Sequence, residues 1–525
     1  MLRTRLFADP QNVLLHDAVL ETCRRLPDKI ALVDTSTDPG RHFTYAEYGD
    51  VVERMARGFV AAGLKPGQVV GIWLPNSWEF AVAYHAATLA GGFATPLNPA
   101  YREREVRYQL ENSGATLLVS DGSLLKDVSL QGLADLRRVY FTRNAHGGAA
   151  HISELLRPHA VSPPHPDQPT NEALAALPYS SGTTGLPKGV MLSHFNLVAN
   201  VYQILGPNTS SLNGADTVLC FLPLYHIYGL TVGLNTMLMS GGTLVLMPRF
   251  NIQDMMRVLV EERITMAPMV PPAINAVCHA AEQGLFPREH CLKWIKSGAA
   301  PLAPELARRF TALTGVIVNQ GYGMTEASPV THVGYVHPPE LNRPWTIGQP
   351  LAQTECRIVD ENENDVALGM RGELVMRGPQ FMRGYWKEPQ ATAAVLRDGW
   401  YWSGDIATRD AEDFYCIVDR RKEMIKYKGF PVAPAEVEAV LLEHPAVRDC
   451  GVVARPDTDA GEIPCAFVVL REGQTASAKM QSDLMGWVSQ RLTGYKQPRE
   501  VHFVDALPRT PSGKILRREL RKSFG

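Results

Sequence analysis

The stretch Tyr179-Ser180-Ser181-Gly182-Thr183-Thr184-Gly185-Leu186-Pro187-Lys188-Gly189-Val190 gathers Ser and Thr hydroxyls, glycines and one lysine in a short segment. The glycines let backbone N–H groups approach phosphate oxygens, the hydroxyls donate further hydrogen bonds, and Lys188 adds a positive charge. A Walker A loop needs Gly-Lys-Ser/Thr in succession, whereas Lys188 lies between Pro187 and Gly189. Taken alone, the stretch also fits a flexible surface loop. We interpret it as an ATP phosphate loop outside the P-loop class.

The overall composition narrows the class of protein. The chain has 525 residues and a net charge of −2, which predicts two to four domains of about 100–200 residues each. It lacks a long run of lysine and arginine, so no broad surface for nucleic acid or anionic lipid is expected. The eight cysteines include no C-x-x-C pair, so we expect reduced thiols in a cytoplasmic protein. Asp9 and Pro10 argue against a signal peptide.

Residues 217–248 carry no charged side chain apart from a possible charge on His226. A membrane helix would need about 20 consecutive apolar residues. Here Pro223 and several glycines divide the run into shorter pieces. We therefore expect buried strands and a buried helix in the core of a large protein, with no membrane span.

Helix and strand patterns alternate along the first part of the chain. Thr44 and Glu47 form a capping box that predicts the start of a helix, and Gly63 predicts its end. The elements expected next are strands over residues 69–73, 93–97 and 116–120 and helices over residues 78–90 and 102–112. Such alternation is typical of parallel sheets covered on both faces, with ligands at the carboxyl ends of the strands. The predicted fold class is α/β, with a large N-terminal domain of doubly wound sheet subdomains.

Two passages predict boundaries in the chain. The proline-rich residues 162–169 indicate a linker between subdomains. Residues 417–430 end a strand in a dense basic cluster, and about 100 residues with their own pattern follow. In this last part the expected elements are helices over residues 434–443 and 482–492 and strands over residues 450–454 and 466–470. We predict an N-terminal domain of residues 1–419 and a small α+β C-terminal domain of residues 420–525.

Five further motifs follow the phosphate loop. They are Pro223-Leu224-Tyr225-His226-Ile227-Tyr228-Gly229, Lys296-Ser297-Gly298-Ala299-Ala300-Pro301, Gln320-Gly321-Tyr322-Gly323-Met324-Thr325-Glu326, Tyr401-Trp402-Ser403-Gly404-Asp405 and Pro508-Arg509-Thr510-Pro511-Ser512-Gly513-Lys514. In this order and spacing the set resembles the adenylate-forming superfamily of acyl-CoA synthetases, firefly luciferases and peptide-synthetase adenylation domains. His226 and the wording Lys426-Tyr427-Lys428-Gly429-Phe430 are most similar to 4-coumarate:CoA ligases. The resemblance runs from about residue 20 to Leu520.

The resemblance implies a ligase that joins a carboxylic acid to ATP as an acyl-AMP and then passes the acyl group to coenzyme A. Two anions must meet in the first step, so the site has to neutralise charge and hold the atoms in line. By resemblance, Lys188 and the loop hydroxyls hold the β- and γ-phosphates, and Thr325 contacts the α-phosphate. The residues implied for ATP or AMP are Ser180, Ser181, Gly182, Thr183, Thr184, Lys188, Gln320, Gly321, Tyr322, Thr325, Asp405, Arg420 and Lys514.

The resemblance also assigns roles in the first step to further polar and charged residues. Glu326 and Thr184 hold Mg²⁺, a hard cation that keeps few protein ligands. Asp405, assisted by Arg420, binds the ribose, because a carboxylate can accept from two hydroxyls. Lys514 reaches the carboxylate and the α-phosphate and stabilises the transition state. From the residues alone, Glu326, Asp405 and Lys514 are also compatible with a solvated carboxylate, a β-turn aspartate and a surface lysine.

For the thiol step, the resemblance implies that a mobile C-terminal domain rotates about Lys422. The rotation withdraws Lys514 and brings Lys426 toward the nucleotide. Arg421 is expected to be a solvated basic residue. Pro431 stands where the family commonly has a glutamine, so no polar contact is assigned there. The residues implied for coenzyme A are Arg249, Lys428 and Gly429.

His226 has two interpretations. The resemblance implies a gate between the nucleotide and acyl sites, whereas the apolar run beside it favours a core histidine. The acyl pocket implied consists of His226, Tyr228, Gly229, Gly298, Ala299, Gly321, Gly323, Met324, Pro329 and Val330. Its small residues leave room for a flat ring and equally admit the start of an alkyl tunnel. The catalytic set implied is Lys514, Glu326, Thr184, His226 and Lys426.

We therefore predict an AMP-forming acid:CoA ligase that uses ATP, Mg²⁺ and coenzyme A. Its acid is apolar, with aryl or 4-coumarate-like acids ahead of medium- and long-chain fatty acids. An adenylating enzyme that loads a carrier-protein pantetheine is an alternative. A non-catalytic binding protein is disfavoured because Lys188, Glu326 and Lys514 are all present. We expect no nucleic-acid partner, and either a monomer or a homodimer.

Overall fold

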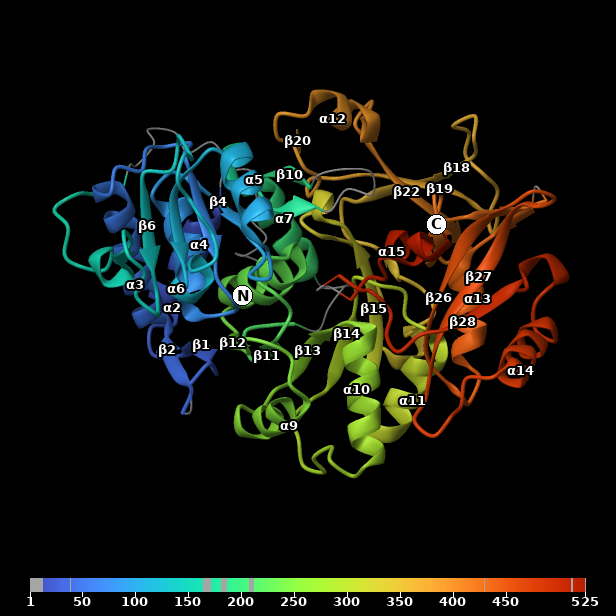
Figure 1. The fold of residues 1–525 in the computed structure, drawn as a ribbon. Helices are drawn as coiled ribbons and strands as arrows, with labels where there is room; N and C mark the ends of the chain where they lie inside the picture. Colours follow the sequence, from blue (N-terminus) through green and yellow to red (C-terminus); the bar gives the residue numbers. More distant parts are fainter. Residues whose placement is uncertain are drawn as a thin grey trace.

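The computed structural model describes residues 13–37, 39–163, 171–180, 187–206, 212–428, 430–510 and 513–524. Their strands form four sheets, two of nine strands and two of five. Figure 1 shows the N-terminal sheet in blue and teal on one side and the C-terminal domain in orange and red on the other, with the green and yellow second sheet between them. The expected linker lies almost wholly outside the described residues, as do Ser181, Gly182, Thr183, Thr184 and Gly429.

The first sheet has the strand order β20-β10-β8-β4-β3-β5-β6-β7, with β9 paired to β10. Its centre is parallel, because β4, β3, β5 and β6 all run in one direction. The strands are β3 (Val69–Trp73), β4 (Phe93–Pro96), β5 (Ala115–Ser120), β6 (Arg138–Phe141), β7 (Ala150–His151), β8 (Leu174–Ala176), β9 (Tyr179–Ser180), β10 (Lys188–Ser193) and β20 (Gly384–Tyr385). The helices nearby in the chain are α2 (Leu15–Arg25), α3 (Tyr45–Ala61), α4 (Trp78–Leu89), α5 (Glu103–Ser113), α6 (Gly122–Leu125) and α7 (His194–Ile204). The Thr44–Glu47 capping box is present at the start of α3.

The second sheet has the order β17-β16-β15-β14-β13-β11-β12-β1-β2 and is parallel from β15 through β1. Its strands are β1 (Ile30–Asp34), β2 (Arg41–Thr44), β11 (Thr217–Cys220), β12 (Thr243–Leu246), β13 (Met266–Met269), β14 (Trp294–Ser297), β15 (Ile317–Gly323), β16 (Val330–Val333) and β17 (Gln349–Pro350). The helices that alternate with them are α8 (Thr236–Ser240), α9 (Ile252–Glu261), α10 (Pro271–Glu282) and α11 (Pro304–Thr314). This arrangement confirms the doubly wound α/β prediction.

The uncharged stretch over residues 217–248 folds into β11, the π-helix η3 (Tyr228–Asn235), α8 and β12. These residues belong to the main hydrophobic core. Among the described residues, none of the helices combines the length and the apolar character that crossing a bilayer requires.

The third and fourth sheets follow in the chain. The third is antiparallel and consists of β18 (Glu355–Val359), β19 (Gly372–Arg377), β21 (Leu396–Arg397), β22 (Trp400–Arg409) and β23 (Tyr415–Arg420), with α12 (Pro389–Val395) beside it. The fourth consists of β24 (Ile425–Tyr427), β25 (Phe430–Val432), β26 (Val447–Asp457), β27 (Gly461–Leu470) and β28 (Glu500–Phe503), with α13 (Pro434–Leu442), α14 (Ala478–Ser489) and α15 (Arg517–Arg521). It has hydrophobic clusters of its own. The division at residues 419 and 420 stays a prediction.

The sequence patterns predicted several elements that are shorter than those in the structure. We expected strands over residues 450–454 and 466–470, but β26 and β27 pair along almost their whole length as a long hairpin. The polar and proline residues at the hairpin end, such as Pro456 and Glu462, broke the apolar pattern although they still pair. Helix α14 begins at Ala478, before the expected residue 482, because the side chain of Ser477 caps it.

Candidate active site

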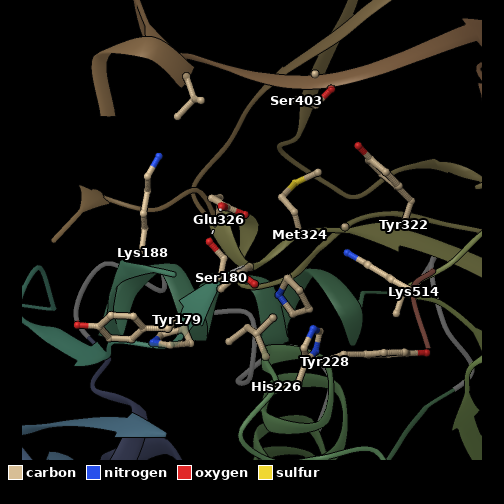
Figure 2. A pocket seen from close by; sticks show the side chains of 18 of the residues that line it. Tyr179, Ser180, Lys188, His226, Tyr228, Tyr322, Met324, Glu326, Ser403 and Lys514 are labelled. Atoms are coloured by element: carbon tan, nitrogen blue, oxygen red, sulfur yellow. Dashed lines mark hydrogen bonds between the residues drawn. The ribbon is translucent and has the colours of Figure 1, made fainter. Parts of the chain in front are cut away.

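A cavity of about 910 Å³ is bordered by residues of the first three sheets and of the C-terminal domain. The carboxyl ends of β14 and β15 border it, as expected for a doubly wound sheet. The first sheet adds Ser180 and Lys188, the third adds residues of β22 and β23, and the C-terminal domain adds Thr510 and Lys514. Figure 2 shows Lys188 and Lys514 on opposite sides of Glu326 and Met324.

Asp405 and Arg420 face each other because the register of β22 with β23 pairs these two positions. Arg420 Nε lies 3.0 Å from Asp405 Oδ1. The hydroxyl of Tyr322 donates to the other oxygen of the same buried carboxylate. The negative charge of Asp405 raises the pKa of Arg420 above its usual value. Arg420 and Tyr322 both border the cavity, so their shared carboxylate lies just behind its wall.

Glu326 lies in the short 3₁₀ turn η4 (Thr325–Ala327), which only Met324 separates from the end of β15. Its Oε1 accepts hydrogen bonds from Tyr385 Oη at 2.8 Å and Ser180 Oγ at 3.2 Å. The side chain is buried and borders the cavity, and it makes no ion pair with any residue that the structure describes. A carboxylate at the wall of a cavity, without an ion-pair partner among the described residues, is suited to be one ligand of a hard cation. Such a cation takes its other ligands from phosphate oxygens and water.

Lys514 enters the cavity from the C-terminal domain (Figure 2). Desolvation by the surrounding protein and then the charge of Arg420 lower its pKa, while Asp405 and Glu326 act in the opposite direction. His226 is half-buried and also borders the cavity. Burial and the charge of Lys514 lower the pKa of His226 to about 4. Its Nδ1 accepts from the backbone N–H of Tyr228 at 3.3 Å. His226 is therefore a neutral imidazole at the cavity wall near physiological pH.

Tyr228, from the predicted acyl pocket, borders the cavity. Its hydroxyl donates to the backbone carbonyl of Lys296 at 3.0 Å. Gly298 packs directly on the ring, since a Cβ added at Gly298 would lie 2.9 Å from Tyr228 Cε1. The other predicted pocket residues that border the cavity are Ala299, Gly321, Gly323, Met324, Pro329 and Val330.

Lys296 begins one of the five sequence motifs, but the sequence analysis assigned it no role in the site. Its side chain is 4% exposed, borders the cavity and makes no hydrogen bond or ion pair within the part of the chain that the structure describes. Burial lowers its pKa to about 7. Beside it, the buried Oγ of Ser297 also has no partner among the described residues. The signal was a lysine within the apolar strand β14, where unpaired charges are costly.

Several predicted site residues lie elsewhere. Gln320 is buried behind the wall, where its side chain binds the backbone of Leu302, Pro344 and Thr346. Gly229 packs on the backbone carbonyl of Pro223 and does not border the cavity. Three basic residues are exposed and do not line it: Arg249, Lys426 and Lys428.

The basic residues at the end of β23 behave differently from one another. Lys422 borders the cavity. Arg421, expected to be only solvated, also borders it and pairs with the buried Glu373 at 2.8 Å. This correction has a simple cause: Glu373 comes from β19, a strand far away in sequence, so its charge could not be foreseen beside Arg421.

Comparisons with known proteins identify the family of the chain. Residues 19–386 match the model of the AMP-binding enzyme family, and residues 436–514 match the AMP-binding enzyme C-terminal domain. The chain is 38% identical to 4-coumarate–CoA ligase 5 of Oryza sativa subsp. japonica over 99% of this chain and 97% of that protein. It is 36% identical to 4-coumarate–CoA ligase of Pinus taeda, over 97% and 94%. A benzoate CoA ligase from Burkholderia xenovorans LB400 superposes with a TM-score of 0.86 at 27% identity, over 97% of this chain and all of that one.

The chain therefore belongs to the AMP-binding enzyme family. Within it, the fold and these relatives define an adenylate-forming acid–CoA ligase of the AMP-forming class. This confirms the resemblance seen in the sequence.

Proposed function

We propose that this ligase activates an aryl carboxylic acid of the 4-coumarate type with ATP and transfers the acyl group to coenzyme A. The observation that carries the proposal is a single cavity bordered by Tyr228, by Lys514 and by Arg420, which pairs with Asp405. A nucleotide and an acid can thus meet in one cavity. The names of the relatives, 4-coumarate–CoA ligases, support the same choice of acid.

In the first step, a carboxylate oxygen of the acid attacks the α-phosphorus of ATP, and the bond to pyrophosphate breaks. We assign Asp405 with Arg420 to the ribose and Tyr322 with Gly321 to the side of the base. Lys188 and Ser180, with the loop residues that the structure does not describe, hold the outer phosphates. Thr325 contacts the α-phosphate. Lys514 neutralises charge that develops on the reacting oxygens, where a fixed cation is most effective.

Glu326, with Thr184, would hold Mg²⁺, which supplies positive charge to the phosphate oxygens. Ser180 and Tyr385 orient the Glu326 carboxylate through the hydrogen bonds they donate to its Oε1.

In the second step, the thiol of coenzyme A attacks the acyl carbonyl and AMP leaves. We assign His226 to the gate between the acid and the nucleotide, and Lys422 to the hinge about which the C-terminal domain turns. Lys426 then replaces Lys514 near the nucleotide, while Arg249, Lys428 and Gly429 meet coenzyme A. The exposure of Arg249, Lys426 and Lys428 leaves them accessible for such contacts.

An aryl acid fits the acyl end better than a long fatty acid. We assign the Tyr228 ring, held by its hydrogen bond to the Lys296 carbonyl, to the end of the acyl pocket. The Lys296 amine lies over the Trp294 ring at 5.4 Å and makes no hydrogen bond among the described residues, so it suits an oxygen on the ring of an acid. The cytosol, and a monomer or homodimer, remain our predictions for the setting of the enzyme.

The test is pyrophosphate release from Mg-ATP over a panel of cinnamic, benzoic and C6 to C18 fatty acids, each with and without coenzyme A or a phosphopantetheinyl carrier protein. We expect release to depend on a hydroxylated aryl acid and to rise with coenzyme A. Preference for long fatty acids would overturn the choice of acid, and preference for the carrier protein would overturn the choice of thiol. If no acid supports release while the protein binds ATP, a non-catalytic binding role replaces the proposal.

A further inference from the structure

The turn that carries Lys514 is held by hydrogen bonds of its own. The backbone N–H of Thr510 donates to the carbonyl of Lys514 at 2.8 Å, and the N–H of Lys514 donates to Thr510 Oγ1 at 3.0 Å. Gly513 has a φ of +84°, and its N–H donates to the carbonyl of Thr510 at 2.8 Å. Arg509 and Ile515 pair across the base of the turn. These contacts tie Lys514 to Thr510, and both residues border the cavity.

Arg509 links this turn to the sheet of the C-terminal domain. Its Nη1 donates to the carbonyl of Gly513, directly before Lys514, at 2.6 Å. Its Nη2 lies 2.7 Å and 2.9 Å from the two carboxylate oxygens of Asp449 on β26. The Arg509 side chain is 23% exposed and that of Asp449 is 31% exposed. A guanidinium can hold a carboxylate and a carbonyl at once because its donors diverge in a rigid plane.

The far side of the turn meets the N-terminal domain. A Cβ added at Gly513 would lie 3.5 Å from Val270 Cβ and 3.6 Å from Pro272 Cδ. Val270 and Pro272 lie at the junction of β13 and α10, beside the carboxyl end of the second sheet. The turn is therefore held by Arg509 on one side and bounded by Val270 on the other, which fixes the point from which Lys514 extends.

We propose that Arg509 and Asp449 are positioning residues for Lys514: the Asp449-anchored guanidinium holds the Gly513 carbonyl, and so sets the place of the Lys514 ammonium during acyl-adenylate formation. The inference rests on the role proposed for Lys514. It makes a specific statement about the two half-reactions. Loss of the Arg509 contact slows adenylation, which uses Lys514, and spares thioester formation, which does not.

The alternative is that the pair only stabilises the C-terminal domain. An exposed or half-exposed ion pair contributes little to stability, typically about 0.2–1 kcal/mol. A stabilising role would lower the melting temperature and affect both half-reactions alike. A positioning role would affect one half-reaction at nearly unchanged stability, since a displacement of about 1 Å at a reacting group can cost about 100-fold in rate.

The variants are Arg509→Ala, Arg509→Lys, Asp449→Asn and Lys514→Ala. Arg455→Ala is the control, because Arg455 lies on β26, as Asp449 does, and forms an ion pair with Glu500, with side chains 41% and 30% exposed. Adenylation is measured as single-turnover pyrophosphate release with the best acid of the panel. Thioester formation is measured separately from the synthetic acyl-adenylate and coenzyme A. Circular dichroism melting reports the fold.

We expect Arg509→Ala to slow adenylation by about 10- to 100-fold and thioester formation by less than about 3-fold. The melting temperature of Arg509→Ala should be close to that of the Arg455→Ala control. Arg509→Lys should recover only part of the rate, because one ammonium lacks the divergent donors of the fork. Asp449→Asn should show the same selective loss, only smaller. Equal slowing of both half-reactions, or an adenylation rate like that of Arg455→Ala, would overturn the proposal.

Lys514→Ala separates failure of this inference from failure of the proposed function. If Lys514→Ala slows adenylation and Arg509→Ala does not, only the positioning role is wrong. If Lys514→Ala leaves adenylation unchanged, the role proposed for Lys514 is wrong and the positioning role falls with it.

Discussion

The hydroxyl of Tyr228 donates a hydrogen bond to the backbone carbonyl oxygen of Lys296, at 3.0 Å, and this contact joins the start of the π-helix η3 to strand β14. The hydrogen bond holds the ring at the cavity wall, with Gly298 close to its hydroxyl end. The length of acid that the enzyme accepts should depend on this ring.

We expect Tyr228→Ala to shift the preference of the enzyme from aryl acids toward longer alkyl acids, because the truncation removes the ring from the end of the proposed acyl pocket. The ratio of kcat/KM for octanoate to that for cinnamate should rise by about tenfold or more, which is the usual effect of a few methylene groups in a pocket. Tyr228→Phe keeps the ring and should change the ratio far less. An unchanged ratio in Tyr228→Ala would show that another residue limits chain length.

Gly298 and Gly321 form a matched pair for testing the packing of that ring. A methyl group at Gly298 would lie 2.9 Å from Tyr228 Cε1, whereas the nearest atom to a methyl group at Gly321 is the His332 carbonyl oxygen at 3.4 Å. Gly298→Ala must therefore displace a ring that is held at its hydroxyl. We expect Gly298→Ala to raise the KM for the acid at least about tenfold, and Gly321→Ala to raise it less. The KM for ATP serves as the internal control, and a larger effect at Gly321 would contradict the packing argument.

Lys296 should make the stability of the protein depend on pH. Its pKa in the fold is about 7, below the usual 10.5, so the unfolded chain holds the proton more tightly. The buried charge thus destabilises the fold fully below pH 7, and the effect fades as the pH rises from 7 toward 10.5. Lys296→Met should raise the melting temperature at pH 6 and have much less effect at pH 9.5. Lys126→Met, at an exposed position, should show no such trend. A pH-independent difference would contradict the assigned pKa.

His226 should not contribute a titration to the activity near neutral pH. Its pKa is lowered to about 4, so the imidazole is neutral from about pH 5 upward and gains a proton only below that range. We expect the pH profile of kcat for His226→Asn to run parallel to that of the parent enzyme between pH 6 and 9. Loss of a limb near pH 6.5 in the variant would mean that His226 titrates there.

Glu326→Gln should weaken the response to Mg²⁺ more than the binding of the acid. The amide keeps the shape of the side chain and can still accept from Ser180 and Tyr385, but it lacks the negative charge. We expect the Mg²⁺ concentration for half-maximal pyrophosphate release to rise about tenfold or more. Tyr385→Phe, which retains the carboxylate, should give a smaller rise. An equal Mg²⁺ response in parent and Glu326→Gln would exclude Glu326 as a ligand.

Much of the fold could be predicted from the sequence. The capping box at Thr44 marks the true start of α3, and the alternation of apolar strands with helices indicates the parallel sheets. These signals are local, since caps and apolar periodicity depend on residues a few positions apart. The long hairpin of β26 and β27 was underestimated because strand pairing continues through polar residues at its end.

The contacts within the candidate site were less predictable. Tyr322 meets Asp405 across 83 positions of sequence, and Tyr385 meets Glu326 across 59. Tyr385 reaches the site because β20 adds to the first sheet beside β10, and no pattern near Gly384-Tyr385 announces this pairing. The lack of a hydrogen bond or ion pair at the Lys296 amine among the described residues likewise depends on what surrounds β14 in space, which only the folded chain specifies.

The positions of the proposed acyl-pocket residues in the chain have a consequence for engineering. Tyr228, Lys296 and Gly298 come from two short runs of the chain, whereas Lys188, Asp405, Arg420 and Lys514 come from other segments. The proposed roles in acid selection and in phosphate handling therefore fall on separate parts of the chain. A small combinatorial library at Tyr228, Lys296 and Gly298 can search for ligases of new acids while the residues proposed for adenylation stay constant.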